Sequence, residues 1–215
     1  MYSAYNKNRS FSSNIDMAAT PDRLNISRGR IQSPRTPSSP SATVGASCVA
    51  DCVRKYVDLH KKWQITVLKG AQYCSAIENI KKGVLESKEE EPNPYPDNLQ
   101  LYCKNLAVLN TILEDVVTSL GNMIQQLRVL QVALKDDTVG KSWNIRQTLV
   151  ALCKVYEYFQ ADLITRRRIA EHIGHALNLN ELAVHVALWE QLYDHIEEIS
   201  LLTRMLSVEF DIPFS

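Results

Sequence analysis

Residues 99–134 read LQLYCKNLAVLNTILEDVVTSLGNMIQQLRVLQVAL, in which an apolar side chain recurs at alternating steps of three and four residues. The recurring positions are Leu99, Tyr102, Leu106, Leu109, Leu113, Val116, Leu120, Met123, Leu127, Leu130 and Leu134. On an α-helix this spacing places the side chains along one seam that faces a neighbouring helix. Such a long seam has to be covered by other helices, either of this chain or of another one. The stretch therefore predicts an all-α component of a helical assembly.

On the N-terminal side, the sequence predicts a long helix over residues 47–87. Its apolar stripe follows the same alternation and includes Trp63, but also His60, Gly70 and Lys81. At Gly70 we expect either a bend or the close approach of a second helix. Three prolines at positions 92–96 end this helix, and Asp97 or Asn98 is expected to cap the next one.

On the C-terminal side, we expect a third helix that Ser142 caps and that continues to about Leu177. A fourth helix is expected after a break at residues 178–180, with a bend around residues 191–194. The expected buried positions of these two helices are Leu149, Leu152, Tyr156, Phe159, Leu163, Arg166, Ala170, Ile173 and Leu177, then Leu182, Val186, Trp189, Leu192, Ile196, Ile199 and Leu206. The predicted fold is an elongated bundle or coiled coil of three long helices plus a shorter one, over residues 47–215.

Residues 1–46 form a separate segment, rich in Ser, Asn, Arg and Pro, which we predict to be disordered. The segment carries six basic and two acidic residues, a net charge of +4, and the remaining 18 basic and 22 acidic residues give −4. Proline-directed kinases recognise an accessible Ser/Thr-Pro, so Ser33, Thr36 and Ser39 are candidate phosphorylation sites. The alternative is that these dipeptides are ordinary linker sequence.

Composition excludes several classes of function. The chain has seven glycines and no glycine-rich loop, which argues against a P-loop and a dinucleotide fingerprint. Five widely spread cysteines and the lack of an apolar signal core favour reduced thiols in the nucleus or cytoplasm. No uncharged stretch reaches the roughly 20 residues of a membrane span. We expect no enzyme activity, no cofactor and no membrane association.

Two groups of residues raise the question of a binding site. His172 and His175 lie three apart on one helical face, but no third metal ligand is evident, so structural histidines are expected. Arg166, Arg167 and Arg168 follow two tyrosines and could bind nucleic acid. The preferred reading is a solvated helix turn that pairs with Asp162 and Glu171, and a protein interface is intermediate between the two.

The stretch from Leu149 to Trp189 resembles the cyclin-dependent kinase 2-interacting protein family. The matching elements are Tyr156, Asp162-Leu163, Arg167, Ile169-Ala170-Glu171, the polar break at residues 178–180 and Trp189. Lys62-Trp63, the Ile-Glu-Asn-Ile of residues 77–80, the basic Ser/Thr-Pro head and the leucine ladder follow in a similar order. The region after Trp189 departs most from the family.

This resemblance implies a non-enzymatic nuclear adaptor. The family is associated with cyclin-dependent kinase 2, an origin-firing kinase and a DNA-damage checkpoint partner. It is also associated with a chromatin-bound AAA ATPase that acts in DNA replication, together with a second small helical subunit. A related ATPase acts in ribosome maturation. The family has no catalytic residues, so none are transferred to this chain.

The expected partner-binding side chains are those of the helix seams: Leu106, Leu109, Leu113, Leu120, Leu127, Trp63, Tyr156 and Trp189. The main alternative is a structural coiled-coil subunit of a tethering, lysosome-related-organelle or kinetochore complex. A module that binds DNA or RNA directly is a third and less favoured reading, because the helical part of the chain is acidic.

Overall fold

The computed structural model describes residues 40–87, 93–135, 137–191 and 196–213, all of which belong to one compact unit, Ser38–Ser215. Among these residues the protein is all-α and contains no strand. The elements are α1 (Pro40–Leu85), α2 (Asp97–Leu134), α3 (Ile145–His172), the single 3-10 turn η1 (Ile173–His175), α4 (Leu179–Gln191) and α5 (Ile196–Glu209). Of residues 1–46, which were expected to be disordered, residues 1–39 with the candidate phosphorylation sites lie outside the described residues, and residues 40–46 belong to α1.

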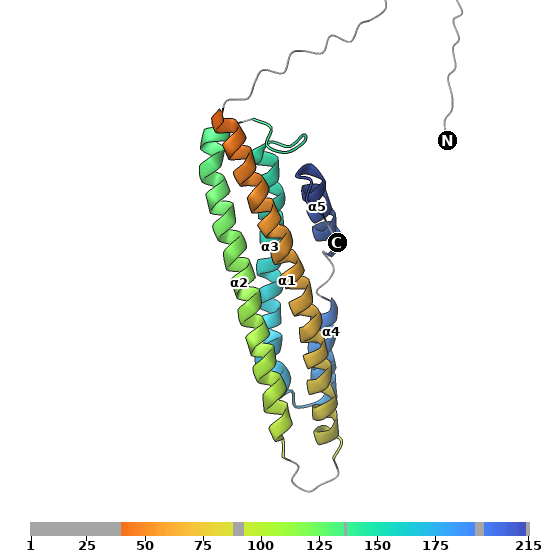
Figure 1. Ribbon diagram of the computed structural model, residues 1–215. Coiled ribbons are helices and arrows are strands. Elements are labelled where there is room, and N and C mark those ends of the chain that lie inside the picture. Colours follow the sequence, from red (N-terminus) through yellow and green to blue (C-terminus); the bar gives the residue numbers. More distant parts are fainter. Residues whose placement is uncertain (1–39, 88–92, 136, 192–195, 214–215) are drawn as a thin grey trace, which may run out of the picture. The chain divides into compact units, whose positions relative to one another are not determined.

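The leucine seam of α2 is buried between two helices of the same chain. α1 and α3 lie beside α2 along its length (Figure 1), and both make extensive contacts with it. Nine of the eleven seam side chains are buried and the other two, Tyr102 and Leu130, are half-buried. Because each buried leucine contributes about 2 kcal/mol, this seam is the main determinant of the helical core.

α4 and α5 together take a fourth position beside α1. α4 packs on the C-terminal half of α1, and α5 packs on the N-terminal half of α1 and on α3 (Figure 1). The apolar interior accordingly forms two clusters, one around Leu120, Leu152 and Phe159 and one around Ile77, Leu106 and Trp189. The expected single fourth helix is two helices in the structure, with the second starting at Ile196.

The first helix starts earlier than the sequence indicated, at Pro40 rather than near residue 47. Proline suits the first turn of a helix, where its missing N–H group would have no partner. Gly45 lies against the last turn of α2, since a Cβ atom there would be 2.5 Å from Leu134 Cδ2. The small residues of this segment thus permit close helix packing, which the search for large apolar side chains overlooked.

Two predicted caps are wrong. α2 follows Pro96 and begins at Asp97 with no side-chain cap. At the start of α3, Asn144 is the cap: its side chain accepts a hydrogen bond from the Gln147 N–H at 3.0 Å, and the Gln147 side chain accepts one from the Asn144 N–H at 2.9 Å. Ser142 instead bonds a carboxylate of the distant residue Glu209, a contact that local sequence cannot reveal.

The end of the third helix also differs from expectation. α3 ends at His172, and one 3-10 turn follows before the chain reverses. Leu177, which was expected in the seam, is 80% exposed because it follows this reversal. The regular spacing of buried side chains in the third helix therefore continues only as far as Ile173.

Candidate functional site

The predicted seam residues are placed in the protein interior rather than on a docking surface. Leu106, Leu109, Leu113, Leu120 and Leu127 are at most 6% exposed, and Trp63 and Trp189 are buried as well. Tyr156 alone is partly exposed, where it packs beside Gly121 of α2. Because this chain's own helices cover the seam, these buried side chains cannot contact a partner while the protein is folded.

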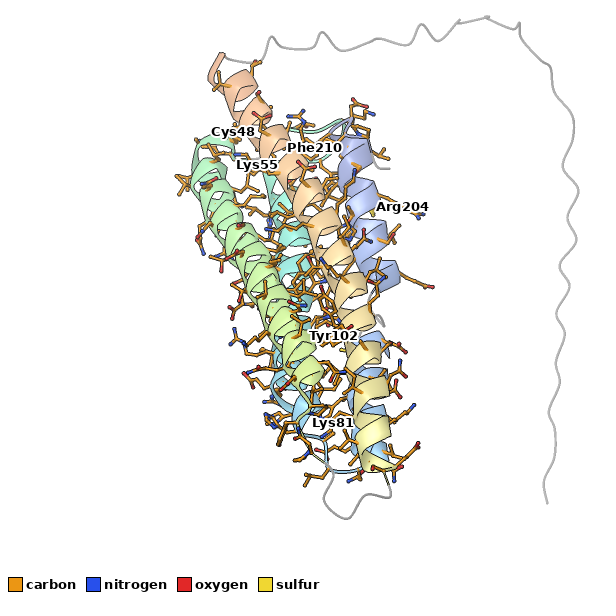
Figure 2. The ribbon with its side chains drawn as sticks, turned by 60° about the horizontal axis from the view of Figure 1, so that its bottom comes forward. Cys48, Lys55, Lys81, Tyr102, Arg204 and Phe210 are labelled. Atoms are coloured by element: carbon orange, nitrogen blue, oxygen red, sulfur yellow. The ribbon has the colours of Figure 1, made fainter. Side chains whose placement is uncertain are left out.

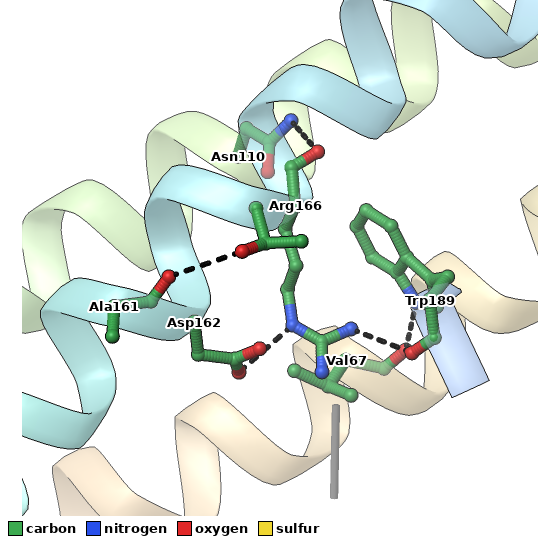
Figure 3. Close-up of polar contacts among 7 residues, drawn as sticks. Val67, Asn110, Ala161, Asp162, Arg166 and Trp189 are labelled. Atoms are coloured by element: carbon green, nitrogen blue, oxygen red, sulfur yellow. Dashed lines mark hydrogen bonds and ion pairs between the residues drawn. The ribbon is translucent and has the colours of Figure 1, made fainter. Parts of the chain in front are cut away.

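A buried polar cluster links α1, α2, α3 and α4. It contains Asp162, Arg166 and Trp189, three residues that the sequence analysis singled out. Arg166 of α3 is 1% exposed, and its Nε donates to Asp162 Oδ2 at 2.9 Å (Figure 3). Its Nη1 donates to the backbone oxygen of Trp189 at 3.1 Å, and its guanidinium lies 4.8 Å from the centre of the Trp189 ring. The expectation that all three consecutive arginines form a solvated turn is therefore wrong for Arg166.

Trp189 fits into a notch on α1. Its Nε1 donates to the backbone oxygen of Val67 at 3.1 Å (Figure 3), and the ring lies directly on Gly70. A Cβ atom at position 70 would be 2.1 Å from Trp189 Cζ2. Of the two readings of Gly70, the structure therefore supports the close approach of another helix.

The charged groups of this cluster are arranged to join helices rather than to react with a substrate. Burial raises the pKa of the Asp162 carboxyl, while Arg166 and a hydrogen bond from the Trp63 side chain act in the opposite direction. Asn110 of α2 donates through Nδ2 to the backbone oxygen of Arg166 at 3.4 Å. The cluster links α1, α2, α3 and α4 and is closed to solvent, so its role is to hold the helices in register.

An aromatic stack extends this core toward the middle of α1. Trp63 and Phe159 stack with ring centres 4.2 Å apart, and the His60 ring lies nearly parallel to the Phe159 ring with centres 6.3 Å apart. Burial lowers the pKa of His60 to about 4, so its imidazole is neutral at physiological pH. This histidine belongs to the core, in agreement with its position in the predicted stripe.

The other two residues of the arginine triplet, Arg167 and Arg168, and the histidine pair His172 and His175 lie on the surface. Arg167 pairs with Glu114 of α2. His172 and His175 are exposed, and the Tyr95 hydroxyl lies 3.1 Å from His175 Nδ1. Within the described ranges, no group of three or more His, Cys, Asp or Glu side chains could hold a metal ion. Nor is any helix in that part of the chain long and apolar enough to cross a membrane.

Several polar contacts fasten α5 to the rest of the unit, among them those of Glu209 and Thr203. The Glu209 carboxylate accepts hydrogen bonds from the N–H groups of Ser142 and Trp143 at 2.8 and 3.1 Å, and from the Ser142 hydroxyl at 2.6 Å. Burial alone would raise the pKa of Glu209, but these hydrogen bonds together hold it below its usual value. Further along α5, Thr203 hydrogen-bonds the buried Tyr56 hydroxyl of α1.

An accessible candidate site is provided by the exposed apolar side chains of α4 and α5, a set that we call the C-terminal apolar face. On α5, Leu201, Met205 and Val208 are 57%, 41% and 65% exposed and are spaced by four and three residues. On α4, Val184 and Leu188 are exposed with the same helical spacing. Sequence reasoning did not single out these five residues, although their helical spacing was already visible.

No protein-family model matches the chain, and no curated protein matches it.

Proposed function

We propose that this protein is a non-enzymatic nuclear adaptor, a cofactor subunit of a replication-associated AAA ATPase that also binds cyclin-dependent and checkpoint kinases. The observation that carries the proposal is the C-terminal apolar face. Its five large apolar side chains follow helical spacing on the two shortest α-helices of the unit. Exposed apolar surface arranged in this way is typical of protein–protein contacts.

The resemblance to the cyclin-dependent kinase 2-interacting protein family is the basis for proposing an ATPase and kinases as partners. Several residues that carry the resemblance have defined structural roles here: Asp162 pairs with Arg166, Arg167 pairs with Glu114, and Trp189 fills the Gly70 notch. The partners themselves, namely the ATPase, a second small helical subunit and the kinases, are proposed from the resemblance.

We further propose that the helices form an elongated, coiled-coil-like bundle that holds the C-terminal apolar face in place. The heptad alternation of α1 and α2 supports this architecture. In this arrangement the seam residues act indirectly, because they position helices whose outer faces contact the partners. The N-terminal segment would contribute through phosphorylation of Ser33, Thr36 or Ser39 by a proline-directed kinase.

The test is affinity purification of the tagged full chain from nuclear extract, followed by mass spectrometry of stoichiometric partners. We expect an AAA ATPase and a second small helical protein. The variant L201S/M205S/V208S should lose at least about tenfold of the captured ATPase, because apolar anchors dominate such interfaces. Its matched control is V129S/V132S/V150S, which removes three exposed valines from α2 and α3 and should retain capture.

Circular dichroism of both variants has to show unchanged helix content. Recovery of other coiled-coil subunits without any ATPase would contradict the proposal and would favour a tethering or kinetochore complex. Phosphopeptide mapping after incubation with a cyclin-dependent kinase tests the kinase part. Phosphate found only within residues 47–215 would contradict it.

A further inference from the structure

Two cysteine side chains lie one helical turn apart on the N-terminal half of α1. Cys48 is exposed and Cys52 is 5% exposed, and both belong to the uninterrupted helix Pro40–Leu85. Residues four apart in a helix are neighbours on the same side of it, with Cβ atoms about 5–6 Å apart. The pair therefore joins one thiol that solvent reaches to a second thiol that the core partly shields.

The two thiols contact one another. Burial raises the pKa of the Cys52 thiol, and the neighbouring Cys48 raises that pKa further, through its charge and through a hydrogen bond between the two thiols. Lys55 acts on the pKa of Cys52 in the opposite direction, because its ammonium group lies close enough to favour the thiolate. Figure 2 shows Cys48 and Lys55 on the same half of α1. Two sulfur atoms and one cation are thus already gathered at this place.

A disulfide bond does not suit the spacing of this pair. A disulfide needs Cβ atoms about 3.5–4.5 Å apart, which is closer than a regular helix places residues separated by four positions. In the structure all five cysteines are free thiols. An ion between the two sulfur atoms suits the spacing better, because two metal–sulfur bonds span a wider gap than one sulfur–sulfur bond does.

The number and the type of ligands limit which ion can bind to this pair. A structural Zn²⁺ site takes four protein ligands, and Ca²⁺ and Mg²⁺ prefer oxygen ligands. Among the residues that the structure describes, no group of three or more His, Cys, Asp or Glu side chains could hold a metal ion. Thiolates bind soft ions such as Cu(I). A Cu(I) ion accepts two thiolates in a nearly linear arrangement, so it needs no third ligand.

We propose that Cys48 and Cys52 form a binding site for Cu(I) with two thiolate ligands. On binding, two S–H bonds are replaced by two Cu–S bonds, two protons pass to solvent, and the copper ion keeps its oxidation state. The resulting copper–dithiolate group has one negative charge, which the ammonium group of Lys55 offsets. This site is distinct from the C-terminal apolar face and does not depend on the proposed adaptor function.

The other three cysteines are less suited to the same ion. Cys74 of α1 is completely buried, so an ion reaches it only if helices separate, although the charge of Cys103 of α2 acts on it. The neighbour of the Cys153 sulfur is a cation, since Nη2 of Arg128 lies 3.9 Å from it. Cys103 and Cys153 are therefore the control positions for the test.

The experiment is an anaerobic titration of the reduced full chain with Cu(I) in competition with bicinchoninate, a chelator that changes colour when it binds Cu(I). Oxygen is excluded because Cu(II) would oxidise the thiols. We expect each chain to bind one Cu(I) ion. The variant C48S should bind Cu(I) at least about 100-fold more weakly, because losing even an outer-sphere partner of a metal site costs about 10–100-fold. The variants C103S and C153S should bind as the unmodified chain does.

A second variant, S47C/C48S, keeps the number of thiols and moves one of them by a single position. Ser47 is exposed, so the exchange leaves the core unchanged. Because successive residues of a helix are turned by about 100°, a thiol at position 47 no longer lies beside Cys52. This variant should lose the Cu(I) site as C48S does. Circular dichroism of each variant has to show unchanged helix content.

Four results would overturn the inference. The first is an unmodified chain that does not compete with bicinchoninate for Cu(I). The second is full binding by S47C/C48S, or loss of binding in C103S, since either would place the ion elsewhere. The third is Zn²⁺ bound as tightly as Cu(I), which would indicate more than two ligands. The fourth is sedimentation that shows one ion joining two chains through Cys48.

Discussion

The substitution Gly70→Ala tests whether the contact between α1 and Trp189 determines how α4 is attached. A Cβ atom at position 70 would lie 2.1 Å from Cζ2 and 2.7 Å from Cε2 of Trp189. The ring is buried and fixed by its hydrogen bond to Val67 and by Arg166 on its face, so it cannot move aside freely. The new methyl group therefore has to push α4 away from α1.

The magnitude follows from three terms. Overpacking of a filled core costs about 1–3 kcal/mol. Loss of the hydrogen bond from Trp189 to Val67 costs about 1 kcal/mol more. The helix propensity of alanine, which is higher than that of glycine, offsets about 1 kcal/mol of this cost. The free energy of unfolding should thus fall by about 2 kcal/mol, which lowers the Tm by about 4–8 °C in a chain of this size.

Gly83→Ala on the same helix is the matched control, because a Cβ atom there meets no atom within 4 Å. It should gain about 0.5–1 kcal/mol from helix propensity alone. Urea and thermal unfolding followed by circular dichroism measure both variants. If Gly70→Ala proves as stabilising as Gly83→Ala, Trp189 does not occupy the notch and the described attachment of α4 is wrong.

Three further predictions concern buried or bonded polar groups. Arg166→Met should lower the unfolding free energy by about 3–5 kcal/mol in urea titrations, because it leaves the Asp162 carboxylate buried without its partner, whereas Arg168→Met at an exposed position should change it by less than about 0.5 kcal/mol. Since the pKa of His60 is about 4 in the folded state and 6.5 when unperturbed, the unfolded chain binds a proton first as the pH falls, so stability is lost from pH 6.5 downward. This loss amounts to about 2 kcal/mol between pH 7 and pH 5, and a His60→Phe variant that retains the same loss would refute the assignment. Glu209→Gln should increase amide hydrogen exchange throughout α5, with an opening free energy lower by about 1–2 kcal/mol, and exchange that stays unchanged would mean that other contacts hold α5 in place.

Long-period patterns were readable from sequence because they repeat over many turns. The seam of α2 predicted both the helix and its buried side chains, and the breaks at the prolines and near residue 178 separated the helices correctly. The errors concern helix ends, the division of the fourth helix into two, and the placement of single residues such as Arg166. Ser142 was expected to cap α3, but its hydroxyl is bonded to Glu209, which lies 67 residues away in the chain.

The candidate site was less predictable than the fold. The helical period predicted that Arg166 is buried in the seam, whereas its charge predicted that it is exposed to solvent. The structure resolves this conflict because Asp162 and the Trp189 carbonyl group accept hydrogen bonds from the buried guanidinium.

The sequence by itself determined that the chain is helical and which stripe of each long helix is apolar, since the helical period is a local property of one segment. Only the tertiary structure decided which helices cover the seam and which outer faces remain for partners. The physical reason is that an apolar stripe is stabilised by any complementary helix, of this chain or another, so the choice depends on contacts between residues far apart. The fit of Trp189 into the notch at Gly70 and the bonds between Glu209 and Ser142 are such contacts.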